Sequence, residues 1–249
     1  LYFRFIKNTM EERKIKEIKY YNKRADDLGE FNSKELSSYR FLYDLLKEIS
    51  RDKIVLDYGC GRGNHTIEIP KMEATEVVGI DLSENSLAIA REKARKEGVG
   101  NKVKFLKMDC EGMDFSDNSF DIVFDGGTFS SLDIKKALPE IARVLKSGGY
   151  LIGIETLGHN PITNLKRKLN KLTGKRTEWA TEHILRIEDL EEFKKYFNKV
   201  NVYYFHLISW LAFPFLNLPG GKFLLKILEV IEKPFLKSTF FKKYAFKVV

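Results

Sequence analysis

Cysteine is scarce in this chain: only two occur among its 249 residues. So few cysteines exclude a disulfide scaffold, and we expect reduced thiols in a cytoplasmic protein. A signal peptide is not expected either, because the apolar start at residues 1–6 is too short for the hydrophobic region of one. No internal repeat is present, so the length favours one large domain.

Uninterrupted apolar runs of membrane-spanning length are also missing. Hydrophobic residues make up 43% and charged residues 31% of the chain, as in a soluble globular protein. Residues 200–221 contain no Asp, Glu, Lys or Arg, and their number alone would allow a transmembrane helix. We exclude that reading because polar residues and prolines interrupt the run, namely His206, Ser209, Pro214, Asn217 and Pro219.

What the sequence does contain is a buried strand that leads into a glycine turn. Ile54-Val55-Leu56-Asp57-Tyr58 is followed by Gly59-Cys60-Gly61-Arg62-Gly63, where glycines let the backbone approach a ligand closely. A second apolar run, residues 77–80, ends in Asp81, whose carboxylate can accept hydrogen bonds from a ribose. This layout is typical of a nucleoside site. A dinucleotide fingerprint would need glycine where the chain has Asn64.

The spacing G-x-G-x-G after Asp57 resembles motif I of the class I S-adenosylmethionine-dependent methyltransferases, in the form found in ubiquinone and menaquinone methyltransferases. The resemblance continues in order through Asp81, Met108-Asp109-Cys110, residues 120–127 and residues 145–151. It implies S-adenosyl-L-methionine as the cofactor and S-adenosyl-L-homocysteine as the product. Asp81 would then hold the ribose hydroxyls, and Asp109 with the following amide would hold the adenine.

The resemblance also implies which other residues contact the cofactor, since the N-terminal helices of this family lie over the cofactor cleft. For Tyr21 and Arg24, a surface helix with one buried aromatic is an alternative that stays open. The expected cofactor contacts are Tyr21, Arg24, Asp57, Gly59, Cys60, Gly61, Gly63, Asp81, Leu82, Asp109, Cys110, Asp125 and Gly126.

Strand-like and helix-like segments alternate through the core, which predicts an α/β, Rossmann-like, mostly parallel sheet with helices on both faces. Ser83 is the expected N-cap of the second core helix, and Gly98 is expected to end that helix. The resemblance implies seven strands, of which the last, near 244–249, is antiparallel. The predicted core strands are 54–58, 76–80, 103–108, 121–125 and 149–155. Three core helices are predicted: one that begins at about residue 64, one at 84–97 and one at 134–145.

We expect a single methyltransferase domain, residues 1–249, with four parts. Residues 1–50 form an N-terminal helical cap, and residues 51–155 form the cofactor-binding core. Residues 156–185 form a basic insertion on the substrate side. Residues 186–249 close the sheet, and they contain an apolar, helical insertion at about 209–240 between strands six and seven.

Methyl transfer from a sulfonium is an in-line displacement with a neutral leaving group, so alignment is the protein's main task. Alignment can supply roughly 7–11 kcal/mol of the barrier. No metal is required, and a general base is needed only when the acceptor's proton must leave early. Glu155 and His159 follow the fifth strand, and His183 follows the basic insertion, so these three are the candidate catalytic residues. A structural role in a loop is the alternative for each histidine.

The net charge of +8 is unevenly placed. Residues 156–177 contain no acidic residue, whereas six Lys or Arg residues crowd into 166–176. This run favours a polyanion, a phosphate-bearing substrate or an anionic membrane surface, or it is a solvated helix face. Residues 222–233 predict an amphipathic helix with a wide apolar face. That face packs on the domain, packs on a second subunit as in a homodimer, or lies in a lipid interface.

Three functions stay open from the sequence. The leading one is methyl transfer to a small acceptor that is hydrophobic, lipid-linked or anionic, by a cytoplasmic enzyme peripheral to the membrane. Nucleic-acid methylation is favoured by the positive charge and the aromatic residues. It is disfavoured because the fourth strand ends in Asp125-Gly126-Gly127-Thr128 and not in an Asn/Asp-Pro-Pro-Tyr/Phe motif. A non-catalytic, cofactor-binding partner subunit is the third.

Overall fold

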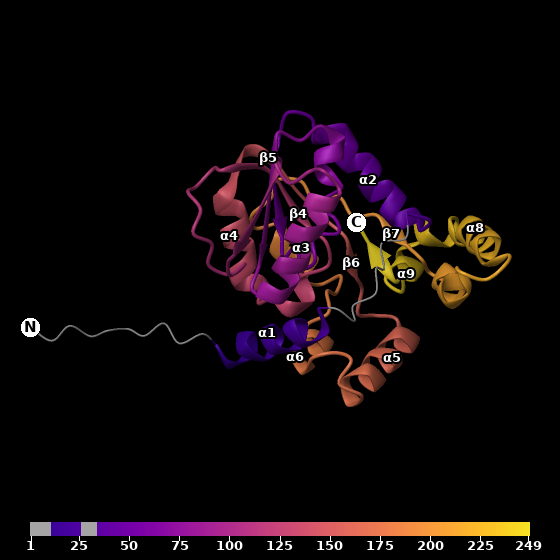
Figure 1. The fold of residues 1–249 in the computed structure, drawn as a ribbon. Helices are drawn as coiled ribbons and strands as arrows, with labels where there is room; N and C mark the ends of the chain where they lie inside the picture. Colours follow the sequence, from indigo (N-terminus) through magenta and orange to yellow (C-terminus); the bar gives the residue numbers. More distant parts are fainter. Residues whose placement is uncertain (1–10, 26–33) are drawn as a thin grey trace, which may run out of the picture.

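The computed structural model describes residues 11–25 and 34–249, and a parallel sheet of five strands forms its centre (Figure 1). The strand order is β3-β2-β1-β4-β5. In register, Tyr58 pairs with Ile80 on one side and with Asp125 on the other, so the strands end at nearly the same level. The strands are β1 Ile54–Tyr58, β2 Glu76–Asp81, β3 Val103–Lys107, β4 Phe120–Asp125 and β5 Leu145–Gly153.

Helices cover both faces of this sheet, as the alternating pattern predicts. On one face, α2 (Ser37–Ile49) and α3 (Glu84–Lys96) pack against a cluster that includes Val55, Val77 and Phe105. On the other face, α4 (Ile134–Val144) packs against a cluster that includes Leu56 and Ile80. The side chains of successive strand residues point to opposite faces, so each strand contributes to both clusters.

The helix after β2 begins and ends where the sequence indicates. The Ser83 side chain accepts a hydrogen bond from the Ser86 N–H, which is an N-cap. Gly98 follows the helix with φ of 69°, a left-handed conformation that glycine adopts without strain. Both expectations for this helix are confirmed.

The helix predicted from about residue 64 is wrong. Turns occupy residues 64–68, and a short 3-10 helix, η1 (Ile69–Met72), follows them. Pro70 explains the difference, because proline has no N–H to donate to the carbonyl four residues earlier. Glu73 then leaves the helical region with φ of 66°.

The single seven-stranded sheet is not formed as predicted. At Ile154 the chain leaves the five-stranded sheet and enters a second sheet of order β6-β8-β7. β4 has already ended at Asp125, so β6 (Glu155–Thr156) pairs only with β8 (Lys247–Val248). β8 is antiparallel to both β6 and β7 (Tyr204–Phe205), which confirms the antiparallel direction of the last strand.

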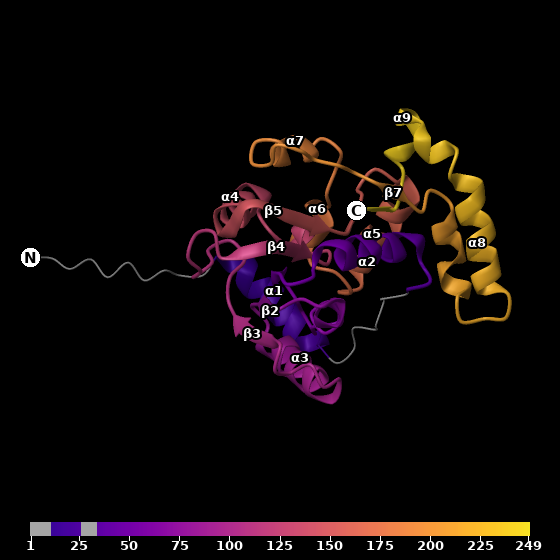
Figure 2. The same ribbon diagram turned by 90° about the horizontal axis from the view of Figure 1, so that it is seen from above.

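The remaining elements surround the two sheets. α1 (Glu12–Arg24) lies across one end of the five-stranded sheet (Figure 1). The other elements are η2 Phe129–Ser131, α5 Pro161–Leu172, α6 Glu178–Glu182, α7 Leu190–Phe193, η3 Ser209–Phe215, α8 Gly221–Glu232, η4 Phe235–Lys237 and α9 Thr239–Lys242. Figure 2 shows α8 at the edge of the molecule, apart from the central strands.

Two sequence expectations concern parts of the chain that the structure covers incompletely. The expected N-terminal cap, residues 1–50, includes residues 1–10 and 26–33, which lie outside the described ranges. The apolar start at residues 1–6 lies wholly outside them. In the described ranges, none of the helices combines the length and the apolar character that crossing a bilayer demands.

Candidate active site

The glycine turn after β1 is shaped by close packing on both sides and is open in the middle. Gly59, Gly61 and Gly63 all have positive φ, at 70°, 50° and 71°. A Cβ on Gly59 would lie 2.4 Å from Thr128 Cγ2, and one on Gly63 would lie 2.8 Å from Ala90 Cβ. A Cβ on Gly61 would meet nothing within 4 Å. The turn is therefore fixed at its ends and leaves free space beside Gly61.

Asp81 is held beside this turn by backbone groups. Its Oδ2 accepts a hydrogen bond from the Gly61 N–H at 2.9 Å, and its Oδ1 accepts one from the Ser83 N–H at 2.7 Å. Burial raises the pKa of Asp81, and these backbone donors oppose the rise. The carboxylate is thus oriented before any ligand binds, and its remaining lone pairs can accept hydrogen bonds from hydroxyl groups.

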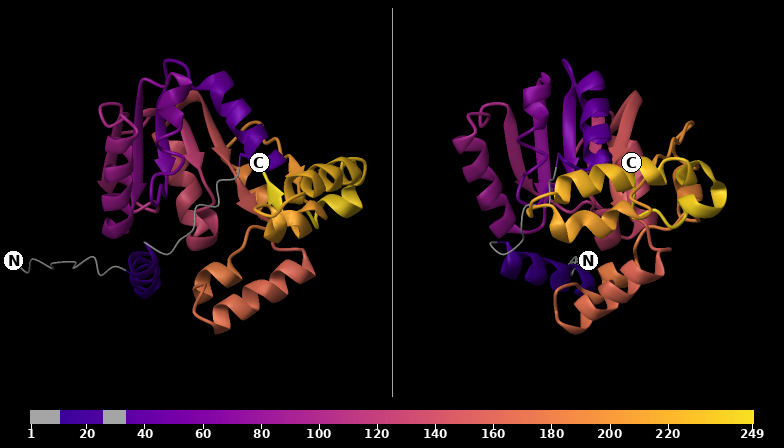
Figure 3. Two further views of the ribbon diagram at one scale, coloured as in Figure 1. Left: turned by 45° about the vertical axis from the view of Figure 1, so that its right-hand side comes forward. Right: turned by 90° about the vertical axis from the view of Figure 1, so that its right-hand side faces the viewer.

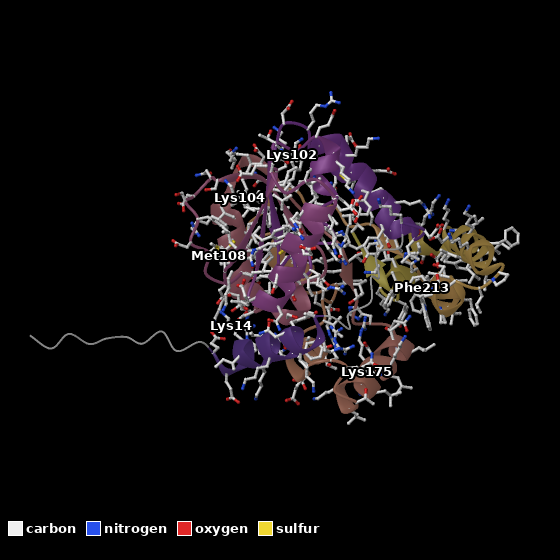
Figure 4. All side chains as sticks on the ribbon, in the orientation of Figure 1. Lys14, Lys102, Lys104, Met108, Lys175 and Phe213 are labelled. Carbon is white, nitrogen blue, oxygen red and sulfur yellow. The ribbon has the colours of Figure 1, made fainter. Side chains whose placement is uncertain are left out.

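Asp109 lies at the end of the neighbouring strand. Its Oδ1 accepts a hydrogen bond from the Glu111 N–H at 2.9 Å. The β2–β3 pairing sets Asp81 beside Lys107, two residues before Asp109, so both acids lie at one edge of the sheet. Figure 4 shows Met108, just before Asp109, between Lys104 and Lys14 of α1, with Lys102 at the far end of the molecule from Lys14.

Helix α1 closes this edge through ion pairs. The Lys14 ammonium donates to Asp109 Oδ2 at 2.7 Å, and Arg13 Nη2 lies 2.6 Å from Glu111 Oε2. The Glu111 side chain is fully buried. Burial works against its charge, but hydrogen bonds from Arg13, Asp133 and Lys14 leave its pKa below the ordinary value. The acid expected to hold adenine is therefore occupied by a side chain of the same protein.

These elements enclose a cavity of about 70 Å³. Sites for small-molecule ligands usually measure about 300–1,000 Å³, so the free space beside α1 is smaller than that of a typical ligand site. The cavity is lined by Arg13, Lys14, Glu17, Ile18, Tyr21, Gly59, Asp81, Leu82, Ser83, Asp109, Cys110, Glu111, Thr128, Ser131 and Leu132.

Glu17 is the unusual member of this lining. Its side chain is buried, yet neither carboxylate oxygen has a hydrogen-bond partner of acceptable geometry among the described residues. Burial raises its pKa, and the neighbouring Thr177 and Ser131 hydroxyls oppose the rise. A buried carboxylate that is only partly compensated by its neighbours is costly. A cationic ligand in the cavity would remove that cost, so the cavity fits a cofactor that carries a sulfonium and an ammonium group.

Tyr21 and Arg24, both expected near the cofactor, have different surroundings. Tyr21 lines the cavity, and its hydroxyl lies 3.2 Å from Ser131 Oγ. Burial raises the pKa of Tyr21 to about 12, so this hydroxyl stays protonated. Arg24 instead donates to the Lys175 carbonyl at 3.1 Å, which ties α1 to the loop after α5.

Other residues predicted to contact the cofactor do not line the cavity. Asp57 is buried, and Thr66 Oγ1 donates to it at 2.5 Å, while burial raises the pKa of Asp57 to about 7. Asp125 is buried and accepts from the Thr128 N–H at 2.9 Å. These acids shape the loops that carry the site. Cys60, Gly61, Gly63 and Gly126 also lie outside the cavity lining.

The surroundings of both cysteine thiols disfavour the reactive thiolate form. Burial raises the pKa of Cys60 and of Cys110 well above the ordinary value, and nearby carboxylates add to the rise. A thiol that stays protonated is a poor nucleophile. Cys110 contributes through its backbone, because its carbonyl accepts a hydrogen bond from the Tyr58 hydroxyl at 2.7 Å.

The three candidate catalytic residues do not line the cavity. Glu155 is buried, and its Oε1 accepts from the Phe129 N–H at 2.7 Å, which anchors η2. His159 Nε2 accepts from the Ile187 N–H at 3.1 Å. His183 stacks on Trp179 with ring centroids 3.6 Å apart. In this conformation all three have structural partners, and their role as a base stays a prediction.

The sequence reasoning did not single out Arg13, Lys14, Glu17 or Glu111, although all four line the cavity. Arg13, Glu17 and Tyr21 are spaced by four residues, which places them on one face of α1. That spacing was the available signal, because a buried Tyr21 would bring its helical neighbours to the same surface.

Comparisons with known proteins identify relatives of the core of this chain. The family described as "Methyltransferase domain" matches residues 55–149. Demethylmenaquinone methyltransferase of Bacteroides fragilis is 36% identical over 109 residues, which cover 42% of this chain and 44% of that protein. Sterol 24-C-methyltransferase ERG6B of Gibberella zeae is 41% identical over 96 residues, which cover 38% of this chain and 25% of that protein.

Two solved structures share the fold. MccD protein has a TM-score of 0.58 at 20% identity and covers 86% of this chain and 95% of its own. YcgJ protein of Bacillus subtilis has a TM-score of 0.53 at 24% identity, and the match covers 67% of this chain and 70% of that protein. The chain spans about half or less of the curated relatives that it matches. Residues 55–149 form a class I S-adenosylmethionine-dependent methyltransferase domain.

Proposed function

We propose that this chain transfers a methyl group from S-adenosylmethionine to a small hydrophobic acceptor. The observation that carries the proposal is the cavity at the strand ends, which is lined by Asp81, by Asp109 and by the buried carboxylate of Glu17. When bound, the cofactor supplies an electrophilic methyl group, whose bond to sulfur breaks as a bond to the acceptor forms, leaving the neutral S-adenosylhomocysteine.

The residues of the cavity have distinct roles in this proposal. Asp81 accepts hydrogen bonds from the ribose hydroxyls, because backbone donors already orient its carboxylate. Asp109 binds the adenine edge once Lys14 leaves it. Glu17 faces the positive charge of the methionine part. Their common contribution is alignment, which can supply roughly 7–11 kcal/mol of the barrier.

The acceptor enters beside Thr128, Ser131 and Leu132, which line the cavity after β4. These residues offer hydroxyl groups and an apolar surface. A hydrophobic acceptor is also supported by the relatives, which are named for demethylmenaquinone and sterol methylation. The acceptor is therefore proposed to be a quinone-like, sterol-like or other lipid-linked molecule.

A transfer assay with methyl-labelled cofactor tests the proposal. The protein is incubated with an organic-solvent extract of lipids, with a water-soluble metabolite extract and with RNA, and each product is extracted and counted. We expect label in the lipid extract, and at least about tenfold less with Asp81→Ala. Label only in RNA, or only in the water-soluble products, would refute the hydrophobic acceptor. No transfer to any pool, despite cofactor binding, would refute catalysis.

Glu17→Gln tests the role given to the buried carboxylate, because it keeps the shape and removes the charge. We expect the dissociation constant for S-adenosylmethionine to rise about tenfold. The dissociation constant for S-adenosylhomocysteine, whose sulfur is neutral, should rise less. Glu12→Gln is a matched control, since Glu12 is an exposed acid on the same helix. Equal losses for both ligands would show that Glu17 does not interact with the sulfonium.

A further inference from the structure

Helix α5 is oriented with its apolar face outward. It buries Thr163 and Arg167 against the protein, and the Arg167 guanidinium donates to the Leu157 carbonyl at 3.1 Å. Its large aliphatic side chains are exposed, at 60% for Ile162, 60% for Leu165, 53% for Leu169 and 81% for Leu172. A helix of a globular domain normally does the opposite.

Helix α8 also exposes most of its large apolar side chains, although Leu225 is buried. Its buried side chains include Glu229 and Glu232, whereas Phe223, Leu224, Ile227, Val230 and Ile231 are exposed. Glu232 accepts hydrogen bonds from the N–H groups of His206, Ile208 and Ser209, and Glu229 pairs with Arg40. These polar contacts fix which face of the helix is inward.

This orientation of α8 also removes negative charge from the outer surface. Glu229 and Glu232 are the only acidic residues in 209–249, and both are buried. The exposed charged residues of α8 and the turn after it are therefore all lysines, namely Lys222, Lys226, Lys233 and Lys237. Along α5, Lys166 and Lys168 are exposed beside the leucines, with Lys175 just beyond the helix.

We propose that the outer faces of α5 and α8 form a docking surface for an anionic lipid membrane. Figures 1 and 3 place both helices on the same half of the molecule. Aromatic and aliphatic side chains among lysines are the composition of helices that lie in a lipid interface. The exposed acids beside the two helices, Glu35, Glu178 and Glu182, are each paired with a lysine. Exposed apolar side chains gathered on two helices indicate an interaction site.

The positive charge of this surface favours an anionic bilayer over a second copy of the chain or another protein. Two copies of the chain meeting through this surface would oppose lysines to lysines, which is unfavourable. Lysine is also depleted in protein–protein interfaces. The negative headgroups of an anionic bilayer instead pair with the lysines while the apolar side chains enter the acyl boundary.

Vesicle co-sedimentation of the full chain tests the proposal. The probes are vesicles of phosphatidylcholine alone and vesicles with one-third phosphatidylglycerol. One variant pair removes apolar side chains from α8, Phe223→Ser with Val230→Ser, and another removes them from α5, Leu165→Ser with Leu169→Ser. Lys226→Glu with Lys233→Glu reverses charge. The matched controls are Tyr150→Ser, an exposed aromatic on β5, and Lys102→Glu, which lies far from α8 (Figure 4).

We expect binding to the anionic vesicles that weakens with salt, and at least about tenfold weaker binding for each of the three variants. Both controls should bind like the wild type, and thermal unfolding should show that all variants stay folded. Two results would overturn the proposal. One is no binding to anionic vesicles, or binding that the variants do not change. The other is a dimer in analytical ultracentrifugation that the α8 variant dissociates. Neither result depends on methyl transfer.

Discussion

Helices α2 and α8 are both amphipathic, yet α8 turns acidic residues inward beside Leu225 and leaves most of its large apolar side chains exposed. α2 buries Leu42 and Leu46 against the sheet, whereas α8 buries Glu229 and Glu232 and exposes Phe223. The difference teaches that periodicity defines a stripe but does not decide which side of a helix is inward. For α2, the neighbouring strands supply apolar surface. For α8, backbone N–H groups near η3 need an acceptor, and Glu232 supplies it.

Removing the Glu232 carboxylate should cause the largest loss of stability among the changes that test this comparison. Glu232→Ala leaves the N–H groups of His206, Ile208 and Ser209 without a carboxylate. Each unsatisfied buried donor costs about 1–3 kcal/mol, so the free energy of unfolding should fall by at least about 3 kcal/mol. Urea denaturation measures it, with the exposed Glu191→Ala as control. A loss below about 1 kcal/mol would mean that Glu232 does not hold α8 in place.

A pair of leucine substitutions compares the two orientations directly. Leu46→Ala in α2 removes a fully buried side chain and should cost about 2–5 kcal/mol. Leu169→Ala in α5 removes a side chain that is 53% exposed and should change stability by no more than about 0.5 kcal/mol. Thermal or urea unfolding measures both. Similar losses at the two positions would contradict the outward face of α5.

Acidification should weaken the contact between α2 and η3. His206 is buried between the Ser38 and Ser209 hydroxyls, and burial, with Lys247 and Arg40, lowers its pKa from 6.5 to about 3. The unfolded chain binds a proton here that the folded chain excludes, so this contribution to stability is complete above pH 6.5 and is lost as the pH falls toward 3.

The measurement for His206 is the free energy of unfolding at several pH values in this window. His206→Asn should be less stable than the wild type at pH 7, and its stability should fall less between pH 6.5 and 4, because the titrating group is gone. An unchanged pH dependence in the variant would show that His206 does not carry the effect.

The smallest effect concerns the cofactor end of the molecule. Lys14→Ala frees Asp109 from an internal ion pair. Partly exposed pairs of this kind are worth about 0.2–1 kcal/mol, so the dissociation constant for S-adenosylmethionine should fall about two- to fivefold. Lys19→Ala, an exposed lysine on the same helix, is the control. A higher dissociation constant for Lys14→Ala would mean that Lys14 helps to bind the cofactor.

The same contrast explains how much the sequence could predict. The strands ending in Tyr58, Asp81 and Asp125 were predictable, because their apolar runs end in glycine or acidic residues at nearly the same level of a parallel sheet. Asp81 and Asp109 followed from their positions at those ends. These features depend on local sequence and on the regular geometry of the sheet.

The features that were missed depend on contacts between distant residues. The pairing of Lys14 with Asp109 joins residues 95 apart, and the anchoring of Phe129 by Glu155 joins residues 26 apart. The spacing of side chains in α8 predicted an apolar stripe but not which face of the helix lies against the protein. The hydrogen bonds from the His206 and Ser209 N–H groups to Glu232 set that orientation. Local patterns carry no information about such partners.

Calorimetric titration with S-adenosylmethionine tests the central claim most directly. The account predicts that the wild-type chain binds this cofactor and that Asp81→Ala weakens binding about 10- to 100-fold, while Asp114→Ala, at an exposed acid, leaves it unchanged. Absence of binding to the wild type, or equal affinity for the Asp81→Ala variant, would contradict it.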